Sequence, residues 1–161
     1  MAIRPLTIGL LLLIAASAPA GASLGQTLAD RAQIFERAVA DFLAGRNAEA
    51  VDGFDALARL DPARAPQLWQ RGIALYYAGR YKDCRAQFES HRTVNPDDVE
   101  NAAWHFMCVA RAESVQAARA ALLPVGPDPR APMRQVYDMF RGTLMPDAVM
   151  AAAGARPEAQ F

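Results

Sequence analysis

The sequence predicts an all-α protein, built as a short α-solenoid of about two and a half helical hairpins with a capping helix pair at its C-terminal end. Three observations predict this fold. Apolar residues recur at helical spacing along most of the chain, one block of sequence repeats every 34 residues, and glycine and proline recur where helices would end. The 161-residue chain is 53% apolar, which suits a single domain with its own core.

The first 22 residues have the pattern of a secretory signal peptide. Arg4 precedes an apolar run from about Leu6 to Ala16, and small residues then follow in the A-x-A arrangement of a cleavage site. The run is too short for a bilayer, so an uncleaved membrane anchor is the less favoured alternative. Cleavage before Ser23 would give an exported, soluble protein, periplasmic or secreted. No cysteine lies near this point to accept a lipid, so no membrane anchor is expected after cleavage.

The charge balance argues against two classes of partner. Without residues 1–22, 16 basic residues remain against 17 acidic residues. The basic residues are interspersed with acids at roughly helical spacing, as on a solvated surface. We therefore expect neither nucleic acid nor an anionic membrane as a partner.

Two complete repeats cover residues 31–64 and 65–98. A step of 34 residues relates Gly45 to Gly79, and each glycine is expected to end the first helix of its hairpin in a left-handed cap. The same step relates further pairs: Ala38 and Gly72, Ala50 and Cys84, Phe54 and Phe88, and Pro62 and Pro96. The small residues of these pairs let the two helices approach closely, the phenylalanines fill the space beside them, and the prolines stop the second helix.

The remainder of the chain continues the pattern in shortened form. Residues 99–124 predict a truncated third repeat, in which Glu113 stands where glycine is expected and Pro124 ends the helix early. Residues 131–154 predict a capping hairpin of two short helices, followed by a C-terminal tail over 155–161.

The two complete units resemble tetratricopeptide repeats (TPRs). The second carries residues at signature positions of that family: Gly72, Tyr76, Gly79, Tyr81, Cys84, Phe88 and Pro96. The resemblance implies a right-handed α-solenoid that binds a protein or peptide in a concave groove. The layout, with repeats, a truncated pair and then "MFRGTLMPDAVMAAA", is also loosely similar to the NlpI lipoprotein family, although the lipid-accepting cysteine is missing. That similarity implies a scaffold for envelope proteins.

The resemblance also indicates which side chains would line the groove. They lie on the first helix of each repeat: Phe35, Val39, Phe42, Trp69, Ile73, Tyr76, Tyr77, Ala103, Met107 and Arg111. TPRs that hold peptide carboxylates carry Lys, Asn and Arg at some of these positions, whereas this chain is mostly apolar there. We therefore expect an apolar peptide or protein partner. In the alternative, residues 23–30 or the C-terminal hairpin fill the groove.

The two cysteines are expected to lie close together. If the helices on either side of Pro96 pack antiparallel through a short loop, Cys84 and Cys108 are nearly level. An oxidising compartment then permits a disulfide between them. In the alternative, they are two buried thiols that serve as small apolar residues.

No catalytic residue, cofactor or metal is expected. The sequence has no phosphate-binding loop and none of the familiar hydrolase, zinc-protease or redox motifs. His91 and His105 would lie level with each other but about two helical turns from the cysteines, so one metal could not bind all four. His105 and Cys108 alone could serve a metal or an enzyme, but no carboxylate is evident to orient the histidine.

From these observations we expect the protein to be a non-catalytic adaptor or scaffold for protein–protein interactions. The main alternative is a structural subunit that self-associates into a homo-oligomer through its aromatic groove. A thiol- or histidine-dependent enzyme is the third interpretation.

Overall fold

The computed structural model describes residues 24–154, which contain helices and no strand. The all-α prediction is therefore confirmed for this part of the chain. Its elements, in order, are α1 (Leu24–Leu43), α2 (Asn47–Leu60), the 3-10 turn η1 (Ala65–Gln67), α3 (Trp69–Tyr77), α4 (Tyr81–His91), α5 (Val99–Ala112), α6 (Val115–Ala120), α7 (Met133–Arg141) and α8 (Pro146–Ala153).

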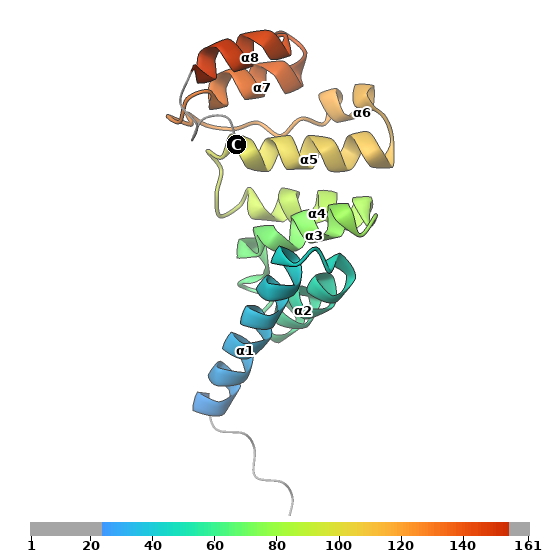
Figure 1. Ribbon diagram of the computed structural model, residues 1–161, viewed down its shortest axis with the longest axis vertical. Coiled ribbons are helices and arrows are strands. Elements are labelled where there is room, and N and C mark those ends of the chain that lie inside the picture. Colours follow the sequence, from blue (N-terminus) through green and yellow to red (C-terminus); the bar gives the residue numbers. More distant parts are fainter. Residues whose placement is uncertain (1–23, 155–161) are drawn as a thin grey trace, which may run out of the picture.

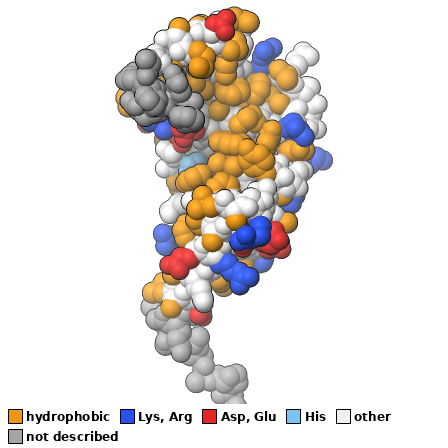
Figure 2. Space-filling model, viewed as in Figure 1, with side chains coloured by type: hydrophobic (Ala, Val, Ile, Leu, Met, Phe, Trp, Pro, Cys, Tyr) orange, Lys and Arg blue, Asp and Glu red, His pale blue; other side chains and the backbone are white. Residues whose placement is uncertain are grey.

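The helices follow one another along the long axis of the molecule, with α1 at one end and the α7–α8 pair at the other (Figure 1). From α1 to α6 each helix packs mainly against its neighbours in the sequence, whereas α7 packs mainly against α5 and, to a smaller extent, against α8. Hydrophobic side chains continue along one face, from the middle of the molecule toward the C-terminal pair (Figure 2). The apolar stripes of the amphipathic helices are thus covered by the helices packed against them.

Glycines end the first two odd-numbered helices, as the sequence predicts. Gly45 follows α1 with φ 71°, and Gly79 follows α3 with φ 76°. A β-carbon disfavours this left-handed conformation, so glycine is the residue that closes these turns at least cost. Pro62 and Pro96 lie beyond the ends of α2 and α4, which stop before reaching them.

The main core lies between α1 and α5 and depends on the small residues at the helix crossings. Phe54 and Phe88 are almost fully buried within it. Ala38 and Ala50 are equally buried where α1 meets α2. A β-carbon on Gly72 would lie 2.5 Å from Cζ of Phe88, so a side chain there would displace the ring.

A second, smaller core joins α5, α6 and α7. Phe106 of α5 and Phe140 of α7 meet with ring centroids 4.9 Å apart, and Val109 and Ala118 are buried beside them. Helix α6 ends at Ala120, several residues before Pro124. The predicted third hairpin is therefore even shorter than the sequence suggested, and α7 covers part of the face of α5 that α6 leaves open.

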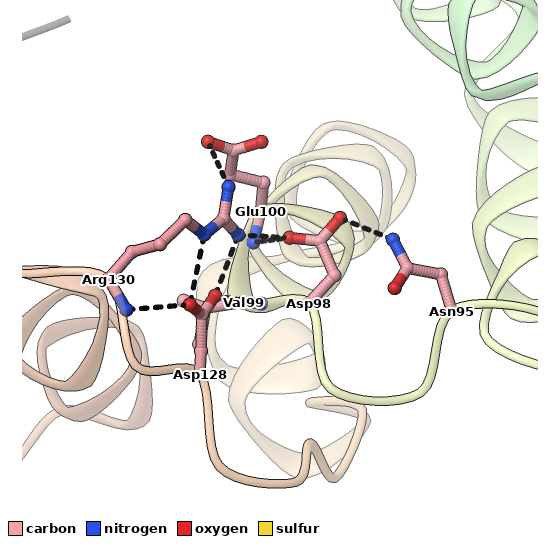
Figure 3. Close-up of polar contacts among 6 residues, drawn as sticks. All are labelled: Asn95, Asp98, Val99, Glu100, Asp128 and Arg130. Atoms are coloured by element: carbon pink, nitrogen blue, oxygen red, sulfur yellow. Dashed lines mark hydrogen bonds and ion pairs between the residues drawn. The ribbon is translucent and has the colours of Figure 1, made fainter.

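The segment between α6 and α7 is fastened to the start of α5 (Figure 3). Asp128 accepts a hydrogen bond from the Val99 amide at 3.3 Å, and Arg130 pairs with Asp128 at 2.7 Å and with Asp98 at 2.8 Å. Asp98 in turn caps α5 by accepting from the Glu100 amide. The hydrogen bonds from Arg130 lower the pKa of Asp128 to about 2. This network fixes a segment without secondary structure, and with it the position of the α7–α8 pair.

Between residues 24 and 154, no helix is both long enough and apolar enough to cross a bilayer. The predicted signal peptide at residues 1–22 and the tail at 155–161 lie outside the described residues.

Candidate functional site

Two hollows lie in a row across α1, α3 and α5, and together we call them the aromatic groove. The first hollow, of about 410 Å³, lies between α1 and α3, and the second, of about 320 Å³, lies between α3 and α5. Trp69, the first residue of α3, lines both. The two hollows therefore adjoin at one aromatic side chain, which is 45% exposed.

The first hollow has an apolar floor and a polar rim. Its apolar lining includes Leu28 and Phe35 from α1 and Trp69 from α3. Phe35 is 37% exposed and also touches the core, because its ring meets Phe54 edge-on with centroids 6.3 Å apart. At the rim, Arg31 pairs with Asp61 at 3.3 Å and ties α1 to the end of α2. Such half-exposed aromatic side chains can contact a ligand without being released from the fold.

The second hollow has aromatic walls on both sides. Trp69 and Ile73 come from α3, and Trp104 comes from α5. The Trp104 ring stacks on Phe88 with centroids 6.3 Å apart and an interplanar angle of 12°. Asn101 lies at the base, where its side-chain amide donates to the Phe88 carbonyl oxygen. The wall formed by Trp104 is thus supported directly by the core.

An aromatic cluster extends from the second hollow toward the C-terminal end of α3. The Tyr76 ring lies 5.4 to 5.6 Å, between centroids, from the rings of Tyr77, Tyr81 and Trp104, in edge-on arrangements. Arg111 adds its guanidinium 5.1 Å from the centre of the Tyr81 ring and donates to the Tyr81 hydroxyl at 2.7 Å. These contacts hold α3, α4 and α5 together at one side of the groove.

The structure separates the candidate groove residues into three sets. Phe35, Trp69 and Ile73 line the hollows, and Ile73 also packs against the core. Three others are partly buried against the core without lining a hollow: Val39, Phe42 and Tyr76. The remainder lie outside both the hollows and this core: Tyr77 is 62% exposed beside Trp104, Arg111 is exposed on Tyr81, and Ala103 and Met107 are half-buried on α5.

Trp104 is one groove residue that sequence reasoning missed. The family positions pointed to Ala103, one residue earlier on α5. A large aromatic residue in an otherwise small and apolar stretch, "NAAWHFMCVA", is the signal that could have found it.

The ends of the described chain do not fill the groove. Residues 24–30 form the beginning of α1, and Leu28 becomes part of the hollow's wall. The C-terminal hairpin packs against α5 through Phe140. Within residues 24–154, the side chains that line both hollows come from α1 to α5 and the turns between them.

Behind the groove, a polar network joins α2, α3 and α4. Arg71 of α3 donates from Nε to Asp55 at 2.7 Å and from Nη1 to Gln87 at 2.7 Å, and Arg80 reaches the same carboxylate at 3.0 Å. Burial alone would raise the pKa of Asp55, but hydrogen bonds from the two guanidinium groups outweigh it and lower the pKa. Arg71 thus ties α3 to both α2 and α4, and its role is structural.

The structure joins Cys84 of α4 to Cys108 of α5 in a disulfide. Their Cα atoms are 5.8 Å apart, within the span that a disulfide bridges, and neither residue has exposed surface. The bond fastens α4 to α5 within the core that supports the second hollow.

The two histidines do not face each other as a pair. Nδ1 of His91 lies 2.8 Å from the Pro66 carbonyl oxygen, and Nε2 of His105 lies 3.3 Å from Oε1 of Glu89. The expectation that no carboxylate is placed to orient a histidine was therefore wrong, because Glu89 on α4 faces α5. His105 is nonetheless fully buried, and Cys108 is consumed by the disulfide. In residues 24–154, no group of three or more possible ligands from His, Cys, Asp and Glu is placed to hold a metal ion.

We expect the stability of the protein to fall as the pH is lowered from about 6.5, because of His105. Burial lowers the pKa of this imidazole, and the hydrogen bond with Glu89 offsets only part of the effect. Its other nitrogen, Nδ1, is buried without a hydrogen-bond partner among residues 24–154, so a second ring proton would have no acceptor. The unfolded chain binds this proton below pH ~6.5 while the folded chain resists it, so the free energy of unfolding decreases by at most about 1.4 kcal/mol per pH unit.

The measurement is urea denaturation between pH 7.5 and 5, comparing the protein with the variant His105→Gln. This range stays above the ordinary pKa of 4.5 for Glu89, and although burial alone would raise that pKa, hydrogen bonds from Arg85 and His105 outweigh the effect of burial and lower it further. The variant removes the imidazole, so its slope should be shallower. Equal slopes for the two proteins would show that His105 does not govern this dependence.

No protein-family model matches this chain, and no curated protein matches it. The class of protein is therefore defined by the fold and the site: an all-α protein whose neighbouring helices form an aromatic groove.

Proposed function

We propose that this protein is an exported, non-catalytic adaptor or scaffold of the TPR type, which binds an apolar segment of a protein or peptide in its aromatic groove. One observation carries the proposal: the two adjoining hollows share the half-exposed Trp69, and Trp104 and Phe35 form their outer walls. Large aromatic side chains in a hollow are typical anchors of binding sites, because they bury much apolar area and lose little conformational entropy.

The TPR-like architecture is supported by the match between the repeat and the helices. The 34-residue period places α1 and α2 in one unit and α3 and α4 in the next, with glycine at the same turn in both. Helix α5 with the short α6 then occupies the place of a truncated third unit. We infer a short right-handed α-solenoid closed by the α7–α8 pair. Export, and a role as a scaffold for envelope proteins, rest on the signal-peptide pattern and on the similarity to the NlpI family.

The absence of catalysis is inferred from the state of the reactive groups. The alternative enzyme would use Cys108 and His105, but the first is in a disulfide and the second is fully buried against Glu89. Neither side chain can meet a substrate without opening the core.

The test of the proposed function is the variant Trp69→Ala. A library of random peptides is selected on the purified protein, and the affinity of the selected peptides is measured by calorimetry. Truncation of Trp69 should weaken binding by roughly 30-fold or more, equivalent to about 2 kcal/mol, with little change in the melting temperature, because the side chain is half-exposed.

The matched control is Val115→Ala on α6, which removes an apolar side chain that is 51% exposed and far along the chain from the groove. This variant should bind the selected peptides as the parent does. A large loss of thermal stability in Trp69→Ala together with unchanged affinity would show that Trp69 is part of the core and not an anchor.

The rival function, a self-associating structural subunit, is favoured by apolar side chains exposed at both ends of the molecule. Leu28 on α1 is 57% exposed, and Met145 and Met150 at α8 are 73% and 58% exposed. Light scattering at several concentrations separates the two functions. A dimer that persists on dilution supports the subunit, and a monomer at all concentrations supports the adaptor.

A further inference from the structure

The rim of the first hollow carries one guanidinium group that is not neutralised. Arg64 lines this hollow from the turn between α2 and η1. Its backbone is held in place, because its amide donates to the Asp61 carbonyl oxygen and its own carbonyl accepts from the Gln67 amide. Its guanidinium makes no hydrogen bond or ion pair with any residue from 24 to 154, and the nearby Asp61 carboxylate is already paired with Arg31. The hollow therefore has an excess of positive charge at its rim.

This charge lies beside apolar surface and uncommitted amides. The same hollow is lined by Phe35 and Trp69 and by the side chains of Gln67 and Gln70. A guanidinium group holds a carboxylate through two parallel hydrogen bonds, and this pairing is stronger where neighbouring apolar groups exclude water. The first hollow thus combines a place for an apolar side chain with a partner for a carboxylate.

The second hollow has the opposite character. Its lining includes Asp98 and Glu100, whose carboxylates both pair with Arg130 from the segment before α7. No unpaired arginine or lysine lines that hollow among the described residues. An acidic ligand group is therefore favoured at the α1 end of the groove and disfavoured at the α5 end, so the groove distinguishes the two directions of a bound peptide.

We propose that the first hollow is a subsite for a large apolar side chain adjacent to a carboxylate, supplied by an extended, acidic segment of a protein partner, and that Arg64 binds the carboxylate. This inference rests on the proposed function, because it specifies the chemistry of the segment bound in the same groove. Phe35 and Trp69 contact the apolar side chain, and Arg64 selects the acidic residue beside it.

The experiment uses two small probes, N-acetylphenylalanine, which has a free carboxylate, and its neutral amide. The sequence contains two tryptophans, so their indole N–H signals in a nitrogen-15 NMR spectrum report on the groove directly. Trp69 lines both hollows, whereas Trp104 lines only the second. We expect the acid to shift the Trp69 signal with about three- to tenfold higher affinity than the amide, the range of one partly exposed charge-assisted pair.

Two variants test whether Arg64 causes the higher affinity for the acid. Arg64→Gln should reduce the affinity for the acid to that for the amide. Arg59→Gln, which removes an exposed arginine of α2 that does not line the hollow, should leave the preference intact. Both positions are exposed, so neither variant is expected to disturb folding.

The outcomes separate this inference from the proposed function. If both probes shift the Trp69 signal with equal affinity, or if Arg64→Gln still prefers the acid, the proposal of a carboxylate subsite is wrong. The apolar groove would then still stand as the proposed binding site. If neither probe shifts Trp69 or Trp104, the apolar groove itself fails as a binding site, and the proposed function fails with it. If simple dilution of the protein shifts the Trp69 signal, a second copy of the chain occupies the hollow, and the subsite for an acidic segment is overturned.

Discussion

Removing the bond between Cys84 and Cys108 is expected to lower the free energy of unfolding by about 3 kcal/mol. The two residues are 24 positions apart in the sequence, so the bond closes a loop of that length in the unfolded chain. Closing such a loop reduces the conformational entropy of the unfolded state by roughly this amount. Both residues are fully buried between α4 and α5, so reduction also leaves two thiols within a packed core.

Thermal unfolding with and without reductant measures this effect. The melting temperature should fall by about 10 °C on reduction, given the size of the described domain. The double variant Cys84→Ser, Cys108→Ser should lose a similar amount, and reductant should then have no further effect on it. An identical melting temperature for the oxidised and reduced protein would mean that the bond contributes nothing to stability.

Replacing Phe88 by alanine is expected to lower the free energy of unfolding by about 4 kcal/mol, because it removes a large side chain from the centre of the core. The side chain is 1% exposed, stacks on Trp104 and fills the space above Gly72. Because Gly72 has no side chain to move into the vacated volume, the cavity would stay open. Removing the Phe88 ring would also leave the Trp104 ring without its stacking partner. The wall that Trp104 forms in the second hollow should therefore be disturbed as well.

Phe35→Ala is the matched control for this prediction. It removes the same ring from a position that is 37% exposed at the edge of the core. We expect a cost of about 1 kcal/mol, because much of that surface already contacts water. Urea denaturation gives both values from the midpoints, provided that the slopes agree. A loss in Phe88→Ala no greater than that in Phe35→Ala would contradict the assignment of Phe88 to the centre of the core.

These effects bear on binding as well as on stability. The disulfide joins α4 to α5, Phe88 packs between α3 and α5, and Arg71 ties α3 to α2 and α4 through Asp55 and Gln87. Under the proposed function, a groove held in this way would not have to be ordered by the peptide that binds it.

The sequence by itself determined the helices and the places where they turn. The positive φ angles at Gly45 and Gly79, and the close approach of Phe88 to Gly72, were predictable from the 34-residue period. The glycine conformations depend on one turn of backbone, and the close approach depends on a pair of positions that recurs from repeat to repeat. A residue type at a fixed spacing is therefore enough to indicate either feature. The near-level placement of Cys84 and Cys108 also followed from a short loop between antiparallel helices.

The side chains that meet between helices were decided only by the tertiary structure. Trp104 rather than Ala103 forms the wall of the second hollow, His105 faces Glu89 rather than His91, and Arg64 is left without a partner among residues 24–154. Successive residues of an α-helix are about 100° apart around its axis, so a small rotation of one helix against another changes which side chain faces its neighbour. The fastening of Asp128 and Arg130 to the start of α5 joins residues about 30 positions apart, and no local pattern indicates it. Packing of the whole chain sets those rotations and long-range contacts, and for that reason the groove's chemistry could be read only from the folded protein.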